Sequence, residues 1–134
     1  MDYTVEFDEK QFESIENILN EELIELGVQN VLLIDLAGNI IVYLDDGNTQ
    51  HDAYSLAALA AGNFGAVSAM AEIIGEKDFP LLFHQGDKTS MHFNKVAQDL
   101  LLVVVFGKNI SLGFLRLKVA QAIKKIQDLM KTAG

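Results

Sequence analysis

Apolar residues near the start of the chain recur at the spacing of a helix. Asp8 can cap this helix, Gln11 stands at the capping-box position, and Phe7 and Phe12 have the spacing of a hydrophobic staple. Gly27 suits the end of the helix. The stripe that we expect to face a core consists of Phe12, Ile15, Leu19, Leu23 and Leu26.

Short runs rich in β-branched and aromatic residues indicate strands in two groups, separated by a helix. The first two runs are joined across Gly38 and read as a hairpin. Pro80 has no N–H, so the third strand is expected to begin late or to lie at a sheet edge. The fifth run is apolar at every position, which is typical of a central strand covered on both faces. The predicted strands are 31–36, 40–44, 79–85, 90–96 and 100–106.

Two further helices are predicted. One spans about 53–74 between the cap Asp52 and Gly75, and the other runs from about 111 to 130. The order is therefore helix, two strands, helix, three strands and helix. Short connections require a largely antiparallel sheet, and the apolar fifth strand requires helices on both of its faces. We expect a single α/β domain of the α+β type over residues 1–134.

The middle helix is apolar on every side. Its large side chains fall in one sector, which predicts a core-facing stripe of Leu56, Leu59, Val67, Met70, Ile73 and Ile74. Ten of the fifteen residues from Ala57 to Ala71 are Ala, Gly or Ser, and Glu72 is the only charge from Ala53 to Ile74. Such a smooth outer face favours a protein interface. The alternatives are a helix buried within its own protomer, or a kink at Gly62-Asn63.

Composition and charge narrow the function classes. The chain has 134 residues, no cysteine and a net charge of −9, so it lacks disulfides and a thiol nucleophile and is predicted to bind neither nucleic acid nor membrane. No apolar run reaches the roughly 18 residues of a membrane span, and we expect a cytoplasmic protein. Residues 1–27 are strongly acidic and 107–134 are basic. Either the first and last helices pack together, or the last presents a basic surface to an anionic partner.

The sequence contains few residues that could bind a metal or take part in catalysis. His84 and His92 flank a predicted hairpin and form at best a weak shared metal site, and we expect neither a resident metal nor a cofactor. Arg116 is the only arginine. It is interpreted as a surface or capping residue, with an arginine finger for phosphoryl transfer as the alternative.

Several local patterns, in order, resemble the Roadblock/light-chain-seven family, and within it the bacterial MglB-type proteins. They cover residues 10–130. The resembling segments are Leu32-Leu33-Ile34-Asp35-Leu36-Ala37-Gly38, Ala60-Ala61-Gly62-Asn63, Ile74-Gly75-Glu76, Phe79-Pro80, Phe83-His84-Gln85-Gly86, Leu102-Val103-Val104-Val105-Phe106, Ser111-Leu112-Gly113 and Arg116-Leu117.

This resemblance implies a Roadblock-like sandwich, with a five-stranded antiparallel sheet, the middle helix on one face and the other two on the opposite face. It implies a homodimer with paired middle helices and joined third strands. It also implies a partner, a small Ras-like GTPase of the MglA type, whose contacts in the family fall on Ala61 and Gly65. The predicted GTPase-binding residues are Ala57, Ala58, Ala61, Gly62, Gly65, Ser68, Ala69 and Glu72.

The resemblance further implies stimulation of GTP hydrolysis by repositioning the GTPase's own catalytic residues, in the front–rear polarity and gliding motility of a bacterium. The chain would then be an activator with no catalytic residue of its own. Two alternatives stay open. One is a Roadblock dimerisation or adaptor module without effect on hydrolysis, and the other is a small-molecule sensor with a pocket of mixed large side chains.

Overall fold

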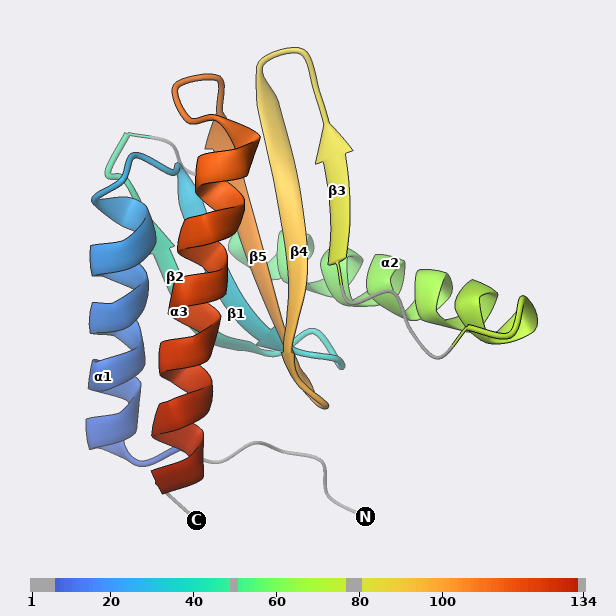
Figure 1. The fold of residues 1–134 in the computed structure, drawn as a ribbon, viewed down its shortest axis with the longest axis horizontal. Coiled ribbons are helices and arrows are strands. Elements are labelled where there is room, and N and C mark those ends of the chain that lie inside the picture. Colours follow the sequence, from blue (N-terminus) through green and yellow to red (C-terminus); the bar gives the residue numbers. More distant parts are fainter. Residues whose placement is uncertain (1–6, 49–50, 77–80, 133–134) are drawn as a thin grey trace.

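The computed structural model describes residues 7–48, 51–76 and 81–132, and shows a five-stranded sheet with helices on both faces (Figure 1). The order of elements is the predicted one. The predicted strand start at Phe79 and Pro80 lies outside the described residues. The elements are α1 (Glu9–Leu19) with a π-helical turn (Asn20–Ile24), β1 (Asn30–Asp35), β2 (Ile40–Asp45), α2 (Ala53–Ile73), β3 (Leu81–Gln85), β4 (Thr89–Ala97), β5 (Leu100–Gly107) and α3 (Leu112–Thr132).

The sheet has the strand order β2-β1-β5-β4-β3, and every neighbouring pair is antiparallel. Strand β5 is central, as its continuous apolar run predicts. Leu102 and Val104 enter the core beneath α1 and α3, whereas Leu101 and Val103 enter the core beneath α2. The predicted antiparallel α+β arrangement, with one helix on one face and two on the other, is confirmed.

The first helix begins as the sequence predicts. The Asp8 carboxylate accepts the backbone N–H of Gln11 at 2.7 Å, and the Gln11 side chain accepts the backbone N–H of Asp8 at 2.9 Å. The rings of Phe7 and Phe12 meet edge-on with centroids 5.7 Å apart. Gly27 follows the helix with a φ of +117°, a conformation in which a side chain would be strained.

The opposite charges of the first and last helices meet at Glu22, on the π-helical turn. Its carboxylate lies 2.6 Å from the Lys125 amine and 3.7 Å from the Lys118 amine. The bond from Lys125 lowers the pKa of Glu22 below its usual range. The expected packing of an acidic first helix beside a basic last helix is confirmed at this contact.

The turn between β1 and β2 positions α2. The Asp35 carboxylate accepts the backbone N–H groups of Ala37 at 3.0 Å and Asn39 at 2.9 Å. Gly38 stands between them with a φ of +91°, and a Cβ at this position would lie 3.2 Å from the Cα of Ala58. The helix therefore passes so close to the turn that a side chain on Gly38 would push it away.

Candidate protein-docking site

The side of α2 that packs on the sheet is its small side. Four residues are almost completely buried there, namely Ala57, Ala60, Ala61 and Phe64. Small side chains allow the helix backbone to lie close to β1 and the hairpin turn. The helix is continuous from Ala53 to Ile73, with no break at Gly62-Asn63.

The predicted core-facing stripe is therefore wrong. Leu59 is 72% exposed, Met70 55%, Ile73 83% and Ile74 68%, while Leu56 and Val67 are half-buried. Tyr54 at the start of the helix is 82% exposed. The alternative of a helix buried within its own protomer is also contradicted. An apolar surface of this size on one helix is typical of a contact with another protein.

The eight residues predicted to bind a GTPase separate into two groups. Ala57 is 0% and Ala61 7% exposed, so both pack on the sheet and neither is free to meet a partner. Of the other six, Ser68 is half-buried and the rest are exposed, namely Ala58, Gly62, Gly65, Ala69 and Glu72. The prediction for those six residues is compatible with their positions.

Four of these residues meet two other elements at one flank of α2. Gly65, Ser68, Ala69 and Glu72 line a cavity of about 450 Å³ together with Phe64, Leu36 and Lys95. We call these seven residues the lower flank. Leu36 follows β1 and Lys95 lies on β4, so helical periodicity could not have identified them; the pairing of strands brings them to α2.

The opposite flank of α2 borders a second groove, of about 460 Å³, beside β4 and β5. Leu56 and Leu59 form one wall, and Met91 and Val105 belong to the other. Asp52 lies at its end, where its carboxylate caps α2 by accepting the Ser55 backbone N–H at 3.1 Å. We call Leu56, Leu59, Met91 and Val105 the upper groove.

The contacts within one protomer do not explain why residues 62 and 65 are glycines. A Cβ at either position would meet nothing within 4 Å, and neither residue has a positive φ. Glycine inside a helix costs about 1 kcal/mol relative to alanine. Neither packing nor backbone conformation within the described residues therefore requires glycine at these two positions.

The comparisons with known proteins identify the family to which this fold belongs. The family model of the Roadblock/LC7 domain matches residues 15–106. The chain belongs to the Roadblock/LC7 family. No match was found among curated protein sequences.

Three solved structures of MglB proteins are similar to this Roadblock/LC7 chain over nearly its whole length. Myxococcus xanthus MglB is 31% identical with a TM-score of 0.86, and 96% of each chain is covered. The gliding protein MglB of Thermus thermophilus is 27% identical with a TM-score of 0.86, covering 98% of each chain. An MglB with a tetrameric arrangement is 26% identical with a TM-score of 0.87, covering 100% of this chain and 99% of that chain.

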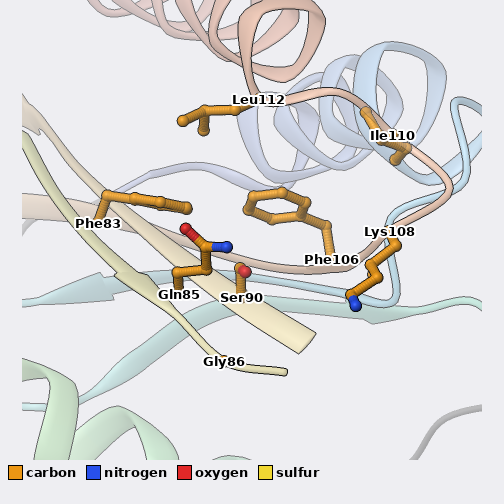
Figure 2. Close-up of a pocket in the computed structure, with 9 residues that line it drawn as sticks. Phe83, Gln85, Gly86, Ser90, Phe106, Lys108, Ile110 and Leu112 are labelled. Carbon is orange, nitrogen blue, oxygen red and sulfur yellow. The ribbon is translucent and has the colours of Figure 1, made fainter. Parts of the chain in front are cut away.

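A third cavity lies on the other face of this Roadblock/LC7 fold, between β3, the end of β5 and the start of α3. It measures about 350 Å³. Figure 2 shows Phe83 and Phe106 side by side within it, and their ring centroids are 6.2 Å apart. Its lining of mixed large side chains suits the sensor hypothesis. However, the polar side chains Gln85, Ser90 and Lys108 are exposed or half-buried, so none is fixed by burial to orient a small ligand.

The two histidines do not share a metal site. His84 pairs with Met91 and His92 with Phe83 across β3 and β4, so the two imidazoles point to opposite faces of the sheet. The idea of a shared metal is therefore wrong. Among the described residues, no group of three His, Asp or Glu could hold a metal ion.

His92 is instead a buried, neutral side chain on the face that carries α3. It is 1% exposed, and burial, with a smaller effect of the nearby Arg116 charge, lowers its pKa from 6.5 to about 4. Within the part of the chain that the structure describes, neither ring nitrogen has a hydrogen-bond partner. The exposed Arg116 lies on α3, on the opposite side of the sheet from α2.

The apolar character of α2 also corrects the expectation that no segment is long enough to cross a membrane. By length and composition alone α2 passes that test, with a mean hydropathy of 1.4 in its most apolar window, of which 28% is buried. A helix that packs one side on a sheet and offers the other to a protein has the same composition. The membrane test and the docking site therefore rest on the same residues.

Proposed function

We propose that this protein is a homodimeric regulator that binds a small Ras-like GTPase of the MglA type and stimulates its GTP hydrolysis, in bacterial cell polarity and gliding motility. It acts in the cytoplasm and contributes no catalytic residue. The observation that carries the proposal is the lower flank of α2, where small exposed residues meet Leu36, Glu72 and Lys95 at one cavity. The similarity to MglB over the whole chain supports it.

The lower flank suits a partner that brings its own backbone close. Gly65 and Ala69 keep the helix surface low, and Glu72 and Lys95 add side chains of opposite charge to the lining of the cavity. A surface of this kind can favour one conformation of a mobile switch segment. If it binds the hydrolysis-competent conformation more tightly, it raises the population of that conformation and so the rate.

Arg116 fits no catalytic role in this proposal. It projects from α3, and the whole thickness of the sheet separates that helix from α2. A GTPase held at the lower flank would not meet it. We therefore expect acceleration of GTP hydrolysis to survive Arg116→Ala.

The test is single-turnover GTP hydrolysis by the MglA-like GTPase of the same organism, with and without this protein. We expect Gly65→Arg to reduce the acceleration at least tenfold, because the added side chain finds open space in the protomer and would stand in the docking cavity. Ala120→Arg is the matched control, since Ala120 is exposed on α3. It should leave the acceleration unchanged.

Three results would change the proposal. Binding without acceleration would favour the adaptor alternative, and no binding at all would contradict the proposal. Loss of acceleration with Arg116→Ala in a folded protein would restore the arginine-finger alternative. Ala61→Arg is a poor probe, because this buried residue would first disrupt packing on the sheet.

A further inference from the structure

The helices α1 and α3 leave one edge of their face of the sheet open. In Figure 1 neither helix crosses in front of β3, and Gln85 at the end of this strand is exposed. The cavity of about 350 Å³ lies at this margin, between β3, the end of β5 and the start of α3. Small-molecule sites in proteins measure roughly 300–1,000 Å³, so a compound of modest size would fit. We call this space the edge cavity.

Three buried polar atoms without a hydrogen-bond partner lie near the edge cavity. They are both ring nitrogens of His92 and the side-chain oxygen of Asn94, within the part of the chain that the structure describes. These two residues follow Ser90 at intervals of two, so all three side chains lie on the face of β4 that carries α3. Ser90 lines the edge cavity. A row of polar groups therefore leads from the edge cavity along β4 into the protein.

The ring of Phe83 separates this row from the edge cavity. Phe83 lines the cavity and pairs with His92 across β3 and β4, and the centroids of the two rings are 6.5 Å apart. Phe83 itself is half-buried, on a strand that α1 and α3 leave open. Its side chain can turn to another staggered rotamer without moving a helix. Such a turn would open the edge cavity to His92.

The unpaired atoms of His92 and Asn94 define what a ligand should offer. Folded proteins pair nearly all of their buried donors and acceptors, and a group left unpaired destabilises the fold. A neutral imidazole has one N–H donor and one acceptor nitrogen, and the Asn94 oxygen is a further acceptor. A matching ligand therefore carries a donor and an acceptor close together, as nitrogen heterocycles do.

The lining of the edge cavity adds an aromatic surface and a positive charge. The rings of Phe83 and Phe106 lie side by side, 25° from parallel, with centroids 6.2 Å apart (Figure 2). Flat rings stack favourably on such a surface. Among the described residues that line the cavity, Lys108 is the only charged one, and α3 begins there at Leu112. A lysine and the N-terminus of a helix both attract an anion.

We propose that the edge cavity binds a small heteroaromatic anion, a flat nitrogen heterocycle that carries a phosphate or carboxylate group. Phe83 turns aside, the ring of the ligand stacks on Phe106 and pairs with His92 and Asn94, and Lys108 neutralises the anionic group. The edge cavity and the lower flank lie on opposite faces of the sheet, so the two sites do not overlap. The inference goes beyond the proposed function and does not depend on it.

The first experiment measures binding to the unaltered chain by NMR titration. Adenosine and guanosine monophosphate are the phosphate probes, and indole-3-acetate and nicotinate are the carboxylate probes. At least one of the four should bind with a Kd of about 1 mM or tighter, and at least tenfold more tightly than its uncharged nucleoside or amide counterpart. No binding by any of them would overturn the inference, and so would equal binding by inorganic phosphate alone.

The same titration locates the ligand. Backbone amide signals should shift in 83–92 and 106–113, and those of 53–73 on the other face of the sheet should stay in place. Shifts confined to 53–73 would overturn the inference. They would leave the proposed function untouched, because that function is tested by GTP hydrolysis in the absence of the probe.

The second experiment removes the buried ring nitrogens. His92→Phe keeps a ring of similar size and should weaken binding of the selected probe at least tenfold. His84→Phe is the matched control, because His84 is exposed on the neighbouring strand β3 and faces the other side of the sheet. Its affinity should stay within twofold of the unaltered chain. Unchanged affinity of His92→Phe, with its fold verified by circular dichroism, would overturn the inference.

The third experiment tests the anionic group. Lys108→Gln should weaken binding of the charged probe at least fivefold and leave binding of its uncharged counterpart within twofold, because the variant removes one positive charge from the cavity. Lys124→Gln is the control of equal net charge, at an exposed position on α3. Equal weakening by both variants would contradict a site that places the anion beside Lys108.

Discussion

Helices α2 and α3 have the same length, 21 residues, and use it in opposite ways. Helix α3 buries Leu115, Val119 and Ile126 and turns most of its lysines outward, although Phe114 and Leu117 also stay exposed. Helix α2 buries alanines and Phe64 and turns Leu59 and Ile73 outward. The difference teaches that apolar side chains on a helix indicate a contact, and that their size does not tell whether the contact lies within the chain.

The largest difference in stability is expected when one leucine on each helix is truncated to alanine. Leu115→Ala, at a position 0% exposed on α3, should lower the free energy of unfolding by about 2–5 kcal/mol. Leu59→Ala, at a position 72% exposed on α2, should change the stability of the dissociated protomer by less than about 0.5 kcal/mol. Urea denaturation at several protein concentrations measures both. A large cost of Leu59→Ala at the lowest concentration would contradict the comparison.

The next effect concerns pH on the α3 face. The pKa of His92 is about 4 in the folded chain against 6.5 ordinarily, so the unfolded chain takes up a proton first as the pH falls. The contribution of neutral His92 to stability is therefore complete above about pH 6.5 and is lost progressively towards pH 4. Between these values the unchanged chain should lose roughly 3 kcal/mol more than His92→Phe. Parallel urea titrations would show this, and identical pH profiles would contradict it.

The smallest effect probes the inner side of α2. Ala60→Leu should cost about 1–3 kcal/mol, because Ala60 is 3% exposed and a larger side chain would lift the helix from the sheet. Ala120→Leu, on the exposed side of α3, is the control and should change stability by less than about 0.5 kcal/mol. Thermal or urea unfolding gives both values. If Ala60→Leu left the free energy of unfolding unchanged, α2 would face the sheet with another side.

The sequence was sufficient for the fold because its local signals agree with one another. The capping box of Asp8 and Gln11, the apolar run of β5 and the glycine between β1 and β2 each allow one local structure, and the short connections allow one kind of sheet. The orientation of α2 could not be obtained in this way. A helix apolar on all sides has no polar face to mark the solvent, so side-chain size is the remaining criterion, and it points to the wrong side.

The candidate site could be predicted only in part for the same reason. Helical periodicity groups Ala57 and Ala61 with Gly65 on the outer face, although the structure buries the two alanines. Gly65, Ser68, Ala69 and Glu72 were named from helical spacing alone. Leu36 and Lys95 were not, because strand pairing brings them beside α2 from distant parts of the chain.

The close contact between Gly38 and Ala58 makes the β1–β2 turn a fixed point about which α2 can tilt. Ile73 lies 15 residues further along α2, roughly 20 Å away at the rise of an α-helix. If α2 tilts by about 5° about its contact with Gly38, that end of the helix moves sideways by about 2 Å. An added methyl group at Gly38 would in this way shift Ala69 and Glu72, which lie towards the far end of α2 in the lower flank, and misalign them with a docked partner.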